Sequence, residues 1–356
     1  MPTELLIVNE PAFRCPKDMV YGPCGGVEFD GTCEVAPHRC VFLDEPTVAW
    51  HGVEADERPG HSDPVPPTPV SAGATAMREL MATGPVVVAD FPARALDAAS
   101  IAECAGLLRG SVDAVLAGDA GAARVQFPPA YRASLIRAAG LEVWTGFNCR
   151  DRNRVAMEGE LAALAHVGVA GVHCVTGDHT FTGQRPDAKP VFDLDSTEAA
   201  SLARANGHLV SVAEAPATPP VDRRPDRLLE KMRAGAEVCF VNHAGGVRPV
   251  AEFIARAQDL GADLKYIPCI PIVVDRESAG LLRTFTTLVL PPGYLDRILD
   301  ARDPFEEGIA AAVELAQGFL AIEGVAGVNL SGGTGPGREA WFAEALARIG
   351  REITAG

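Results

Sequence analysis

The chain has 356 residues, 47% of them hydrophobic and 22% charged, which suits a globular protein with one large core and a small extra unit. Its formal net charge of −16 argues against nucleic acid as a partner, because phosphate backbones bind to basic surfaces. We find no secretory signal and no stretch of the ~18 apolar residues that a membrane-spanning helix needs. The sequence therefore predicts a cytoplasmic protein with no membrane segment.

Cysteines gather near the start of the chain. Four of the nine are Cys15, Cys24, Cys33 and Cys40. A unit spanning residues 1–50 is too short to build its own core, so it needs a staple or a surface to dock on. Four thiolates around a structural Zn²⁺ would provide the staple, with His38 able to replace one ligand. The alternative is four reduced, buried cysteines in a docked loop.

A proline-rich segment follows at residues 51–76. Five prolines fall between Pro59 and Pro69. Because proline lacks a backbone N–H and fixes one backbone dihedral, we expect an irregular, stiff linker here.

Strand and helix patterns alternate from about residue 84 onward. The predicted strands are 86–90, 114–117, 142–147, 172–176, 209–212, 238–242, 266–270 and 327–330. The predicted helices are 98–109, 130–139, 152–167, 197–205, 226–234, 249–260 and 339–349, with a helical insert at 277–323. Eight such units predict a (β/α)₈ TIM barrel over residues 77–356, with a doubly wound open sheet as the alternative.

Polar residues follow most of the predicted strands, where a barrel places its chemistry. They are Asp90, Asp119, residues 148–152, residues 176–179, Glu214, residues 242–243 and residues 329–333. We expect Asp178 and Lys189 to face one site; the alternative is that Asp178 caps a turn in a solvated loop. For Arg150, binding of a ligand and a structural ion pair are equally supported by the sequence. Lys231, taken alone, is predicted to be a solvated lysine.

Five motifs carry a family resemblance. They are CRDRNR at 149–154, TGD at 176–178, DAKPVFDLDS at 187–196, KMRAGAEVCFVN at 231–242 and IPCIPI at 267–272. In this order and spacing they resemble the methylenetetrahydrofolate reductase family over about residues 84–350. The run CPKDMVYGPCGG, with GTCEV and Cys40 after it, is similar to the zinc-binding module of some of these reductases, which acetogens carry on a separate subunit.

The resemblance implies a barrel that holds FAD across its mouth. NADH or NADPH would reduce the flavin, and the flavin would pass the hydride to 5,10-methylenetetrahydrofolate, giving 5-methyltetrahydrofolate for one-carbon metabolism and methionine biosynthesis. By motif position, the cofactor-binding residues are Cys149, Arg150, Thr176, Gly177, Asp178, Lys189, Asp193, Ser196 and Lys231, with Lys231 at the phosphates. Asp178 would also lie near the pterin as a catalytic residue, and Asp119 and Asn242 would contact the folate. A homo-oligomer and an electron-transfer partner protein both stay open.

Two positions depart from the family pattern. The family has a glutamate near the end of the first strand that helps to open the methylene bridge; the corresponding residue here is Ala89. The adjacent Asp90 is our candidate acid, although neighbouring strand residues point to opposite faces, so we expect Asp90 to aim inward only if the strand bulges. Asn242 replaces a glutamine. Three alternatives follow: a flavin-dependent reductase, a flavin-free enzyme with direct hydride transfer, and a non-catalytic folate-binding subunit that docks a partner through its zinc module. A zinc-dependent methyl transferase is a remote fourth.

Overall fold

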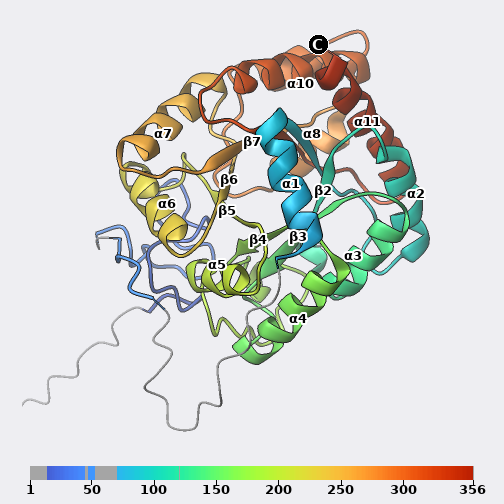
Figure 1. The fold of residues 1–356 in the computed structure, drawn as a ribbon. Coiled ribbons are helices and arrows are strands. Elements are labelled where there is room, and N and C mark those ends of the chain that lie inside the picture. Colours follow the sequence, from blue (N-terminus) through green and yellow to red (C-terminus); the bar gives the residue numbers. More distant parts are fainter. Residues whose placement is uncertain (1–13, 45–46, 53–69, 120, 356) are drawn as a thin grey trace, which may run out of the picture.

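Eight parallel strands close into a barrel in this protein, with helices around the outside (Figure 1). The computed structural model describes residues 14–44, 47–52, 70–119 and 121–355. Each strand pairs with its neighbour along the chain, and β1 pairs with β8 to close the ring. The predicted (β/α)₈ barrel is confirmed, and the open-sheet alternative is wrong.

The strands lie where the apolar runs of the sequence placed them. They are β1 (Val86–Asp90), β2 (Ala114–Ala117), β3 (Val143–Asn148), β4 (Gly171–Val175), β5 (Val210–Glu214), β6 (Val238–Val241), β7 (Lys265–Pro271) and β8 (Gly327–Ser331). These segments are almost wholly buried because both faces of the sheet are covered. Their apolar runs are therefore continuous, which allowed the strands to be predicted from the sequence.

The outer helices follow the predicted order. They are α2 (Ala98–Leu108), α3 (Pro129–Ala138), α4 (Arg154–Val167), α5 (Ser196–Ala205), α6 (Arg224–Arg233), α7 (Val247–Asp259) and α11 (Glu339–Ala355). The predicted insert before β8 consists of α8 (Arg276–Leu282), α9 (Tyr294–Leu299) and α10 (Pro304–Leu320). A capping box formed by Asp195 and Glu198 begins α5.

Alternate strand residues divide the core into two. Val87 and Ala89 of β1 pack outward against the helices, whereas Val86 and Val88 join Trp144 and other side chains inside the barrel. By this alternation Asp90 lies on the inward face of β1 and Ala89 on the outward face. The expectation that Asp90 needs a bulge to face inward is therefore wrong.

A helix closes the N-terminal end of the barrel. It is α1 (Ala72–Thr83), whose Ala74 and Met77 pack on the inner core. The helix begins within residues 51–76, so the prediction of irregular structure up to residue 76 is wrong at its end. The physical reason is that the prolines stop at Pro69. Residues 53–69 lie outside the described part of the chain.

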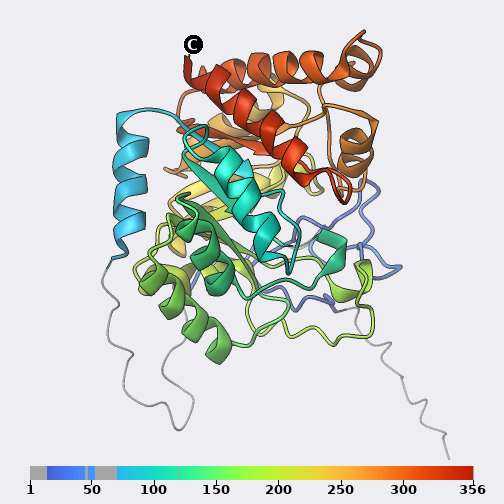
Figure 2. The same cartoon turned by 90° about the vertical axis from the view of Figure 1, so that its right-hand side faces the viewer.

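The cysteine-rich unit lies at the opposite end of the barrel from α1 (Figure 2). The backbone N–H groups of Val20 and Tyr21 donate to the Asp195 carboxylate, and Arg224 donates to the carbonyls of Pro23 and Cys24. The unit is thus docked on α5 and α6, beside the carboxyl ends of the strands. Among the described residues, no helix is both long and apolar enough to cross a bilayer.

Candidate functional site

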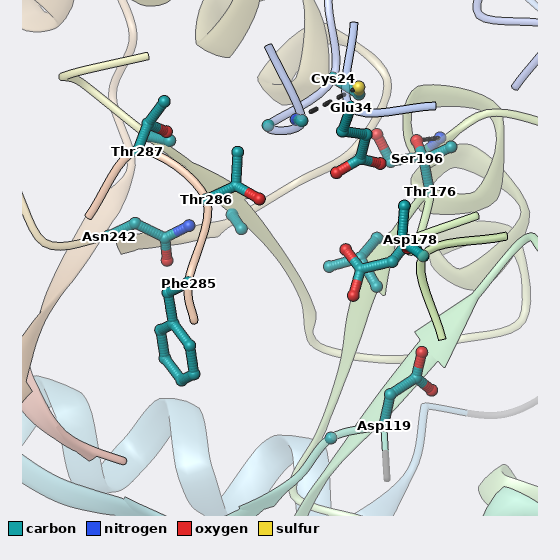
Figure 3. A pocket seen from close by; sticks show the side chains of 18 of the residues that line it. Cys24, Glu34, Asp119, Thr176, Asp178, Ser196, Asn242, Phe285, Thr286 and Thr287 are labelled. Atoms are coloured by element: carbon teal, nitrogen blue, oxygen red, sulfur yellow. Dashed lines mark hydrogen bonds between the residues drawn. The ribbon is translucent and has the colours of Figure 1, made fainter. Parts of the chain in front are cut away.

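A cavity of about 820 Å³ opens at the carboxyl ends of the strands (Figure 3). The barrel supplies most of its wall, including strand-end residues from β2, β4, β5 and β6. The N-terminal unit supplies Lys17, Met19, Cys24 and Glu34. The small unit is therefore part of the cavity wall, and the site is built from both parts of the chain.

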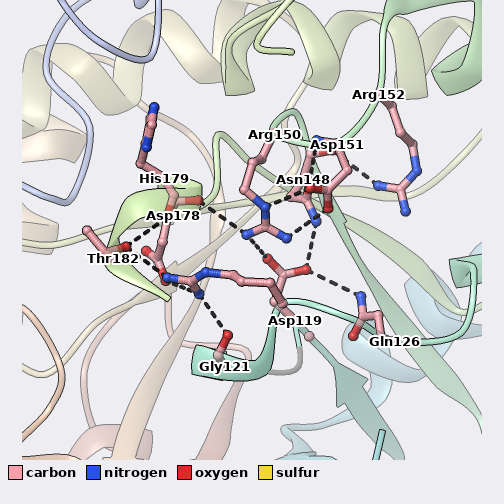
Figure 4. Close-up of polar contacts among 12 residues, drawn as sticks. Asp119, Gly121, Gln126, Asn148, Arg150, Asp151, Arg152, Asp178, His179 and Thr182 are labelled. Atoms are coloured by element: carbon pink, nitrogen blue, oxygen red, sulfur yellow. Dashed lines mark hydrogen bonds and ion pairs between the residues drawn. The ribbon is translucent and has the colours of Figure 1, made fainter. Parts of the chain in front are cut away.

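Asp119 lies on the cavity wall just after β2, where its carboxylate accepts hydrogen bonds from Asn148, Arg150 and Gln126. Asn148 donates to one carboxylate oxygen at 2.7 Å, and Arg150 donates to the other at 3.1 Å (Figure 4). The Arg150 side chain is fully buried, and it also pairs with Asp151 and donates to the Asp178 carbonyl. Arg150 is absent from the residues that line the cavity. Its position supports the structural ion pair, because its donors are spent on Asp119, Asp151 and the β4 loop.

The segment after β4 reaches the cavity as predicted. Thr176, Gly177 and Asp178 all line it, and Ser196 joins them because its N–H donates to the Thr176 hydroxyl at 3.2 Å. Gly177 has φ +87, and an added Cβ would lie 3.0 Å from the Cβ of Asn148, so glycine suits this position on both counts.

Asp178 forms an ion pair that the sequence did not predict. Arg124 donates to its carboxylate at 3.0 Å and to the Thr182 hydroxyl at 2.8 Å. The Asp178 side chain is 60% exposed. Arg124 lies in the irregular segment after β2, where no pattern in the sequence marked it.

Lys231 lies on the cavity wall, but its amine is already engaged. It donates to the Glu214 carboxylate at 2.8 Å and to the Ala213 carbonyl at 2.7 Å. Arg224 donates to the other Glu214 oxygen at 3.2 Å. Burial would raise the pKa of Glu214, but the charges of Lys231 and Arg224 hold it below its ordinary value. The lysine is a buried ion-pair partner, in contrast to the solvated lysine that the sequence alone suggested.

Besides Arg150, three predicted cofactor residues do not line the cavity. Cys149 is fully buried against the outer core, and burial raises the pKa of its thiol well above the ordinary value. Lys189 is exposed on the loop after β4. Asp193 is exposed and accepts the Arg154 N–H at 2.8 Å, so it caps the start of α4. The structure does not bring these residues together with Asp178.

Asp90 lies beneath the cavity, on the inward face of β1. Its carboxyl accepts from the Asn329 amide at 2.9 Å and from the Gly332 N–H at 3.1 Å. Burial raises its pKa above the ordinary value, although hydrogen bonds from Asn329, Ser331 and Gly332 oppose the shift. Ser331 lines the cavity, whereas Asp90 itself does not.

The far wall from Asp119 and Asp178 comes from β6 and the segment before α9 (Figure 3). Asn242 lines the cavity as predicted, and its neighbour His243 does too. Residues 284–288 complete this wall, and Thr287 has φ 52, a left-handed conformation that is strained for a β-branched side chain. The sequence marked His243 only as a polar residue after a strand, and nothing marked residues 284–288.

The four N-terminal cysteines lie close enough together for their thiols to influence one another's pKa. Burial raises the pKa of Cys15 and raises that of Cys40 to about 11, and the other thiols of the group add to both shifts. Yet no three His, Cys, Asp or Glu side chains in the described residues are arranged to hold a metal ion. The donor set therefore contains the right atoms for Zn²⁺ without the geometry, and zinc stays a prediction.

The charges that line the cavity do not fit a diphosphate. The lining cations are Lys17, Arg124 and Lys231, and these pair with Glu34, Asp178 and Glu214 respectively. Glu28 and Asp119 add further negative charge. Among the described lining residues no cation is left over for the diphosphate of a flavin or nicotinamide dinucleotide. Carboxylates and amides instead suit a neutral ring that is rich in N–H donors.

Comparison with known proteins bears on the N-terminal unit first. Residues 8–54 match a family described as methylene-tetrahydrofolate reductase C terminal. The resemblance to the methylenetetrahydrofolate reductase family is confirmed at this unit. No curated protein matches the chain.

Solved structures share the barrel. An uncharacterized protein from Clostridium thermocellum, described as binding two copies of 5-methyl-5,6,7,8-tetrahydrofolic acid, is 10% identical with a TM-score of 0.55 over 76% of this chain and 98% of that one. A 2,3-dimethylmalate lyase is 15% identical, with a TM-score of 0.44 over 73% of this chain and 81% of that one. At such low identity these likenesses show the fold alone.

Proposed function

We propose that this chain binds a reduced folate in the cavity and reduces 5,10-methylenetetrahydrofolate to 5-methyltetrahydrofolate. The observation that carries the proposal is the composite cavity: the unit that matches the reductase-associated family forms part of its wall, opposite the barrel residues. The barrel neighbour that binds a methylated folate adds support from its fold.

The polar groups of the cavity suit the pterin ring. A pterin presents an amino group and ring N–H groups, which can donate hydrogen bonds to carboxylate oxygens. Asp119 and Asp178 supply such oxygens on one wall, and the Asn242 amide faces them from the other (Figure 3). We assign the pterin to the space between these walls.

The reaction needs a hydride at the one-carbon unit and a proton on the nitrogen that leaves it. Asp90 is our acid, because burial raises its pKa and favours the protonated form. Ser331, which lines the cavity and hydrogen-bonds Asp90, is the group through which the proton would pass. We route no step through flavin, because the lining does not fit its diphosphate.

The hydride would come from NADH or NADPH, whose diphosphate would lie outside the cavity because no lining cation among the described residues is left to pair with it. One other role keeps specific support. A non-catalytic folate-binding subunit is favoured by the position of Asp90, which does not itself line the cavity. Zinc in the N-terminal unit is a separate proposal, which metal analysis of the purified protein tests.

The first experiment is anaerobic calorimetry with 5-methyltetrahydrofolate, followed by oxidation of NADH or NADPH in the presence of methylenetetrahydrofolate, with and without added FAD. Folate binding with turnover that needs no flavin is the expected result. Folate binding without turnover under any condition would support the non-catalytic role. Absence of folate binding would overturn the proposal.

A further inference from the structure

One buried histidine on the cavity wall lacks partners for its ring. His243 is 8% exposed, and neither Nδ1 nor Nε2 makes a hydrogen bond of good geometry within the described residues. The Cys269 backbone opposes only in part the lowering of the His243 pKa by burial. Buried polar atoms nearly always make hydrogen bonds, so an imidazole without them at a cavity indicates that a bound ligand supplies the partner.

The contrast with a second histidine in the same cavity is direct. His173 is equally buried, and its Nδ1 hydrogen-bonds the Ser211 hydroxyl at 2.9 Å. Carboxylates on the opposite wall are likewise satisfied, Asp119 by Asn148 and Arg150. Glu34 and Arg124 also line the cavity and each has one side-chain atom without a hydrogen-bond partner, but each keeps an ion pair, whereas both ring nitrogens of His243 lack a partner within the described residues.

The backbone around His243 is held in place. Its carbonyl accepts the Val289 N–H at 3.3 Å, and the Gly245 N–H donates to the Val289 carbonyl at 2.9 Å. The imidazole lies beside Phe285, with ring centroids 6.5 Å apart. These contacts fix the residue between β6 and the 284–288 wall, where a bound ring can meet it.

We propose that His243 hydrogen-bonds the pterin ring of the folate, an inference that rests on the proposed function. A neutral imidazole offers one N–H donor and one acceptor nitrogen, which match the N–H and C=O groups of a pterin. Burial lowers the pKa of His243 to about 4, so the ring carries no charge at neutral pH to attract the carboxylates of the glutamate tail. The histidine thus recognises the ring end of the ligand.

The test replaces the ring by one of similar shape without polar atoms, His243→Phe. Affinity for 5-methyltetrahydrofolate should fall about tenfold, the equivalent of one hydrogen bond. The same loss should appear for 6-methyltetrahydropterin, whereas p-aminobenzoylglutamate should bind as it does to the wild type. Unfolding by denaturant should occur at the same concentration or a higher one, because unpaired buried atoms have been removed.

The matched control is His208→Phe, a buried histidine outside the cavity whose Nε2 hydrogen-bonds the Leu161 carbonyl. This variant should lose stability and keep wild-type affinity. Wild-type affinity of His243→Phe for the folate and the pterin would overturn the inference alone, as would a loss confined to p-aminobenzoylglutamate. Failure of the wild type to bind any of these probes would overturn the proposed function as well.

Discussion

Asp90 is the residue on which the proposed reduction depends. Replacement by Asn keeps the shape and removes the proton, so turnover should fall by about 10²–10⁴-fold. Affinity for 5-methyltetrahydrofolate should stay the same, because Asp90 does not line the cavity. In the wild type, activity should decline as the pH rises through the Asp90 pKa, which burial has raised.

Steady-state kinetics and calorimetry on Asp90→Asn check this prediction. The matched control is Asp113→Asn, since the Asp113 carboxylate accepts the Val87 N–H away from the carboxyl ends of the strands. Asp113→Asn should turn over at the wild-type rate. A fully active Asp90→Asn enzyme would remove Asp90 from the mechanism.

His243 also predicts how stability depends on pH. Its pKa is about 4 in the folded protein and 6.5 as a free side chain, so the unfolded chain binds protons first as the pH falls. The folded state therefore loses stability between pH 6.5 and pH 4. Between pH 7 and pH 5 this single group should cost about 2 kcal/mol, and His243→Phe should be spared that loss.

Denaturant unfolding of both proteins at the two pH values measures the difference. Replacement of the exposed His166 on α4 by Gln provides the control, and it should lose as much stability as the wild type does. Equal pH dependence in His243→Phe and the wild type would show that His243 is protonated alike in both states.

At the scale of single residues, the sequence predicted positions better than partners. Thr176, Asp178, Asp119 and Asn242 were placed on the cavity because residues at strand ends converge in any barrel. The ion-pair partners of Asp178 and Lys231 could not be predicted from the sequence. Arg124 lies in an irregular segment, and Glu214 is 17 residues away from Lys231 along the chain. Long-range ion pairs leave no periodic trace in a sequence.

Helix α1 shows how closely one element must fit the barrel. A Cβ added to Gly73 would lie 2.2 Å from the Gly168 carbonyl oxygen, so the helix approaches the α4–β4 turn without room for a side chain. Gly73→Ala should destabilise the protein by about 1–3 kcal/mol through overpacking. Gly159→Ala on α4 meets nothing within 4 Å and should stabilise by about 0.5–1 kcal/mol, because alanine favours the helix.

Thermal or denaturant unfolding separates these two alanine variants. The comparison isolates the close approach of α1, since both changes add one methyl group to a helical glycine. Equal stability of the two variants would mean that α1 can move away from the barrel at little cost.

The docking of the N-terminal unit depends on α6. Arg224 is 1% exposed and donates to the carbonyls of Pro23 and Cys24 as well as to Glu214. Arg224→Met should cost about 3–5 kcal/mol, because it breaks a buried ion pair and leaves those acceptors unpaired. It should also weaken folate binding, since the unit supplies part of the cavity wall.

Arg233→Met on the same helix is the control. Arg233 is 51% exposed in its pair with Glu230, and loss of an exposed pair should cost less than about 1 kcal/mol. Limited proteolysis should cut the N-terminal unit faster in Arg224→Met than in Arg233→Met. Equal rates would show that the unit is held by its other contacts.

For the whole molecule, the architecture was predictable and the assembly of the site was not. Eight buried parallel strands produce apolar runs that the sequence displays, so the barrel and its order could be read. The position of the cysteine-rich unit could not, because its contacts with Asp195 and Arg224 depend on three-dimensional closure. Helix α1 was missed because its first residues continue a proline-rich stretch whose composition resembles a linker.

The same docking has a consequence for how the protein is made. Tyr21 meets Asp195 across 174 residues, and Cys24 meets Arg224 across 200. On the ribosome the cysteine-rich unit emerges well before the residues of α5 and α6 on which it docks. Until then its thiols are more open to the solvent than in the folded protein, where all four cysteines are half-buried, so a nascent chain that stalls early would leave them more exposed to oxidants.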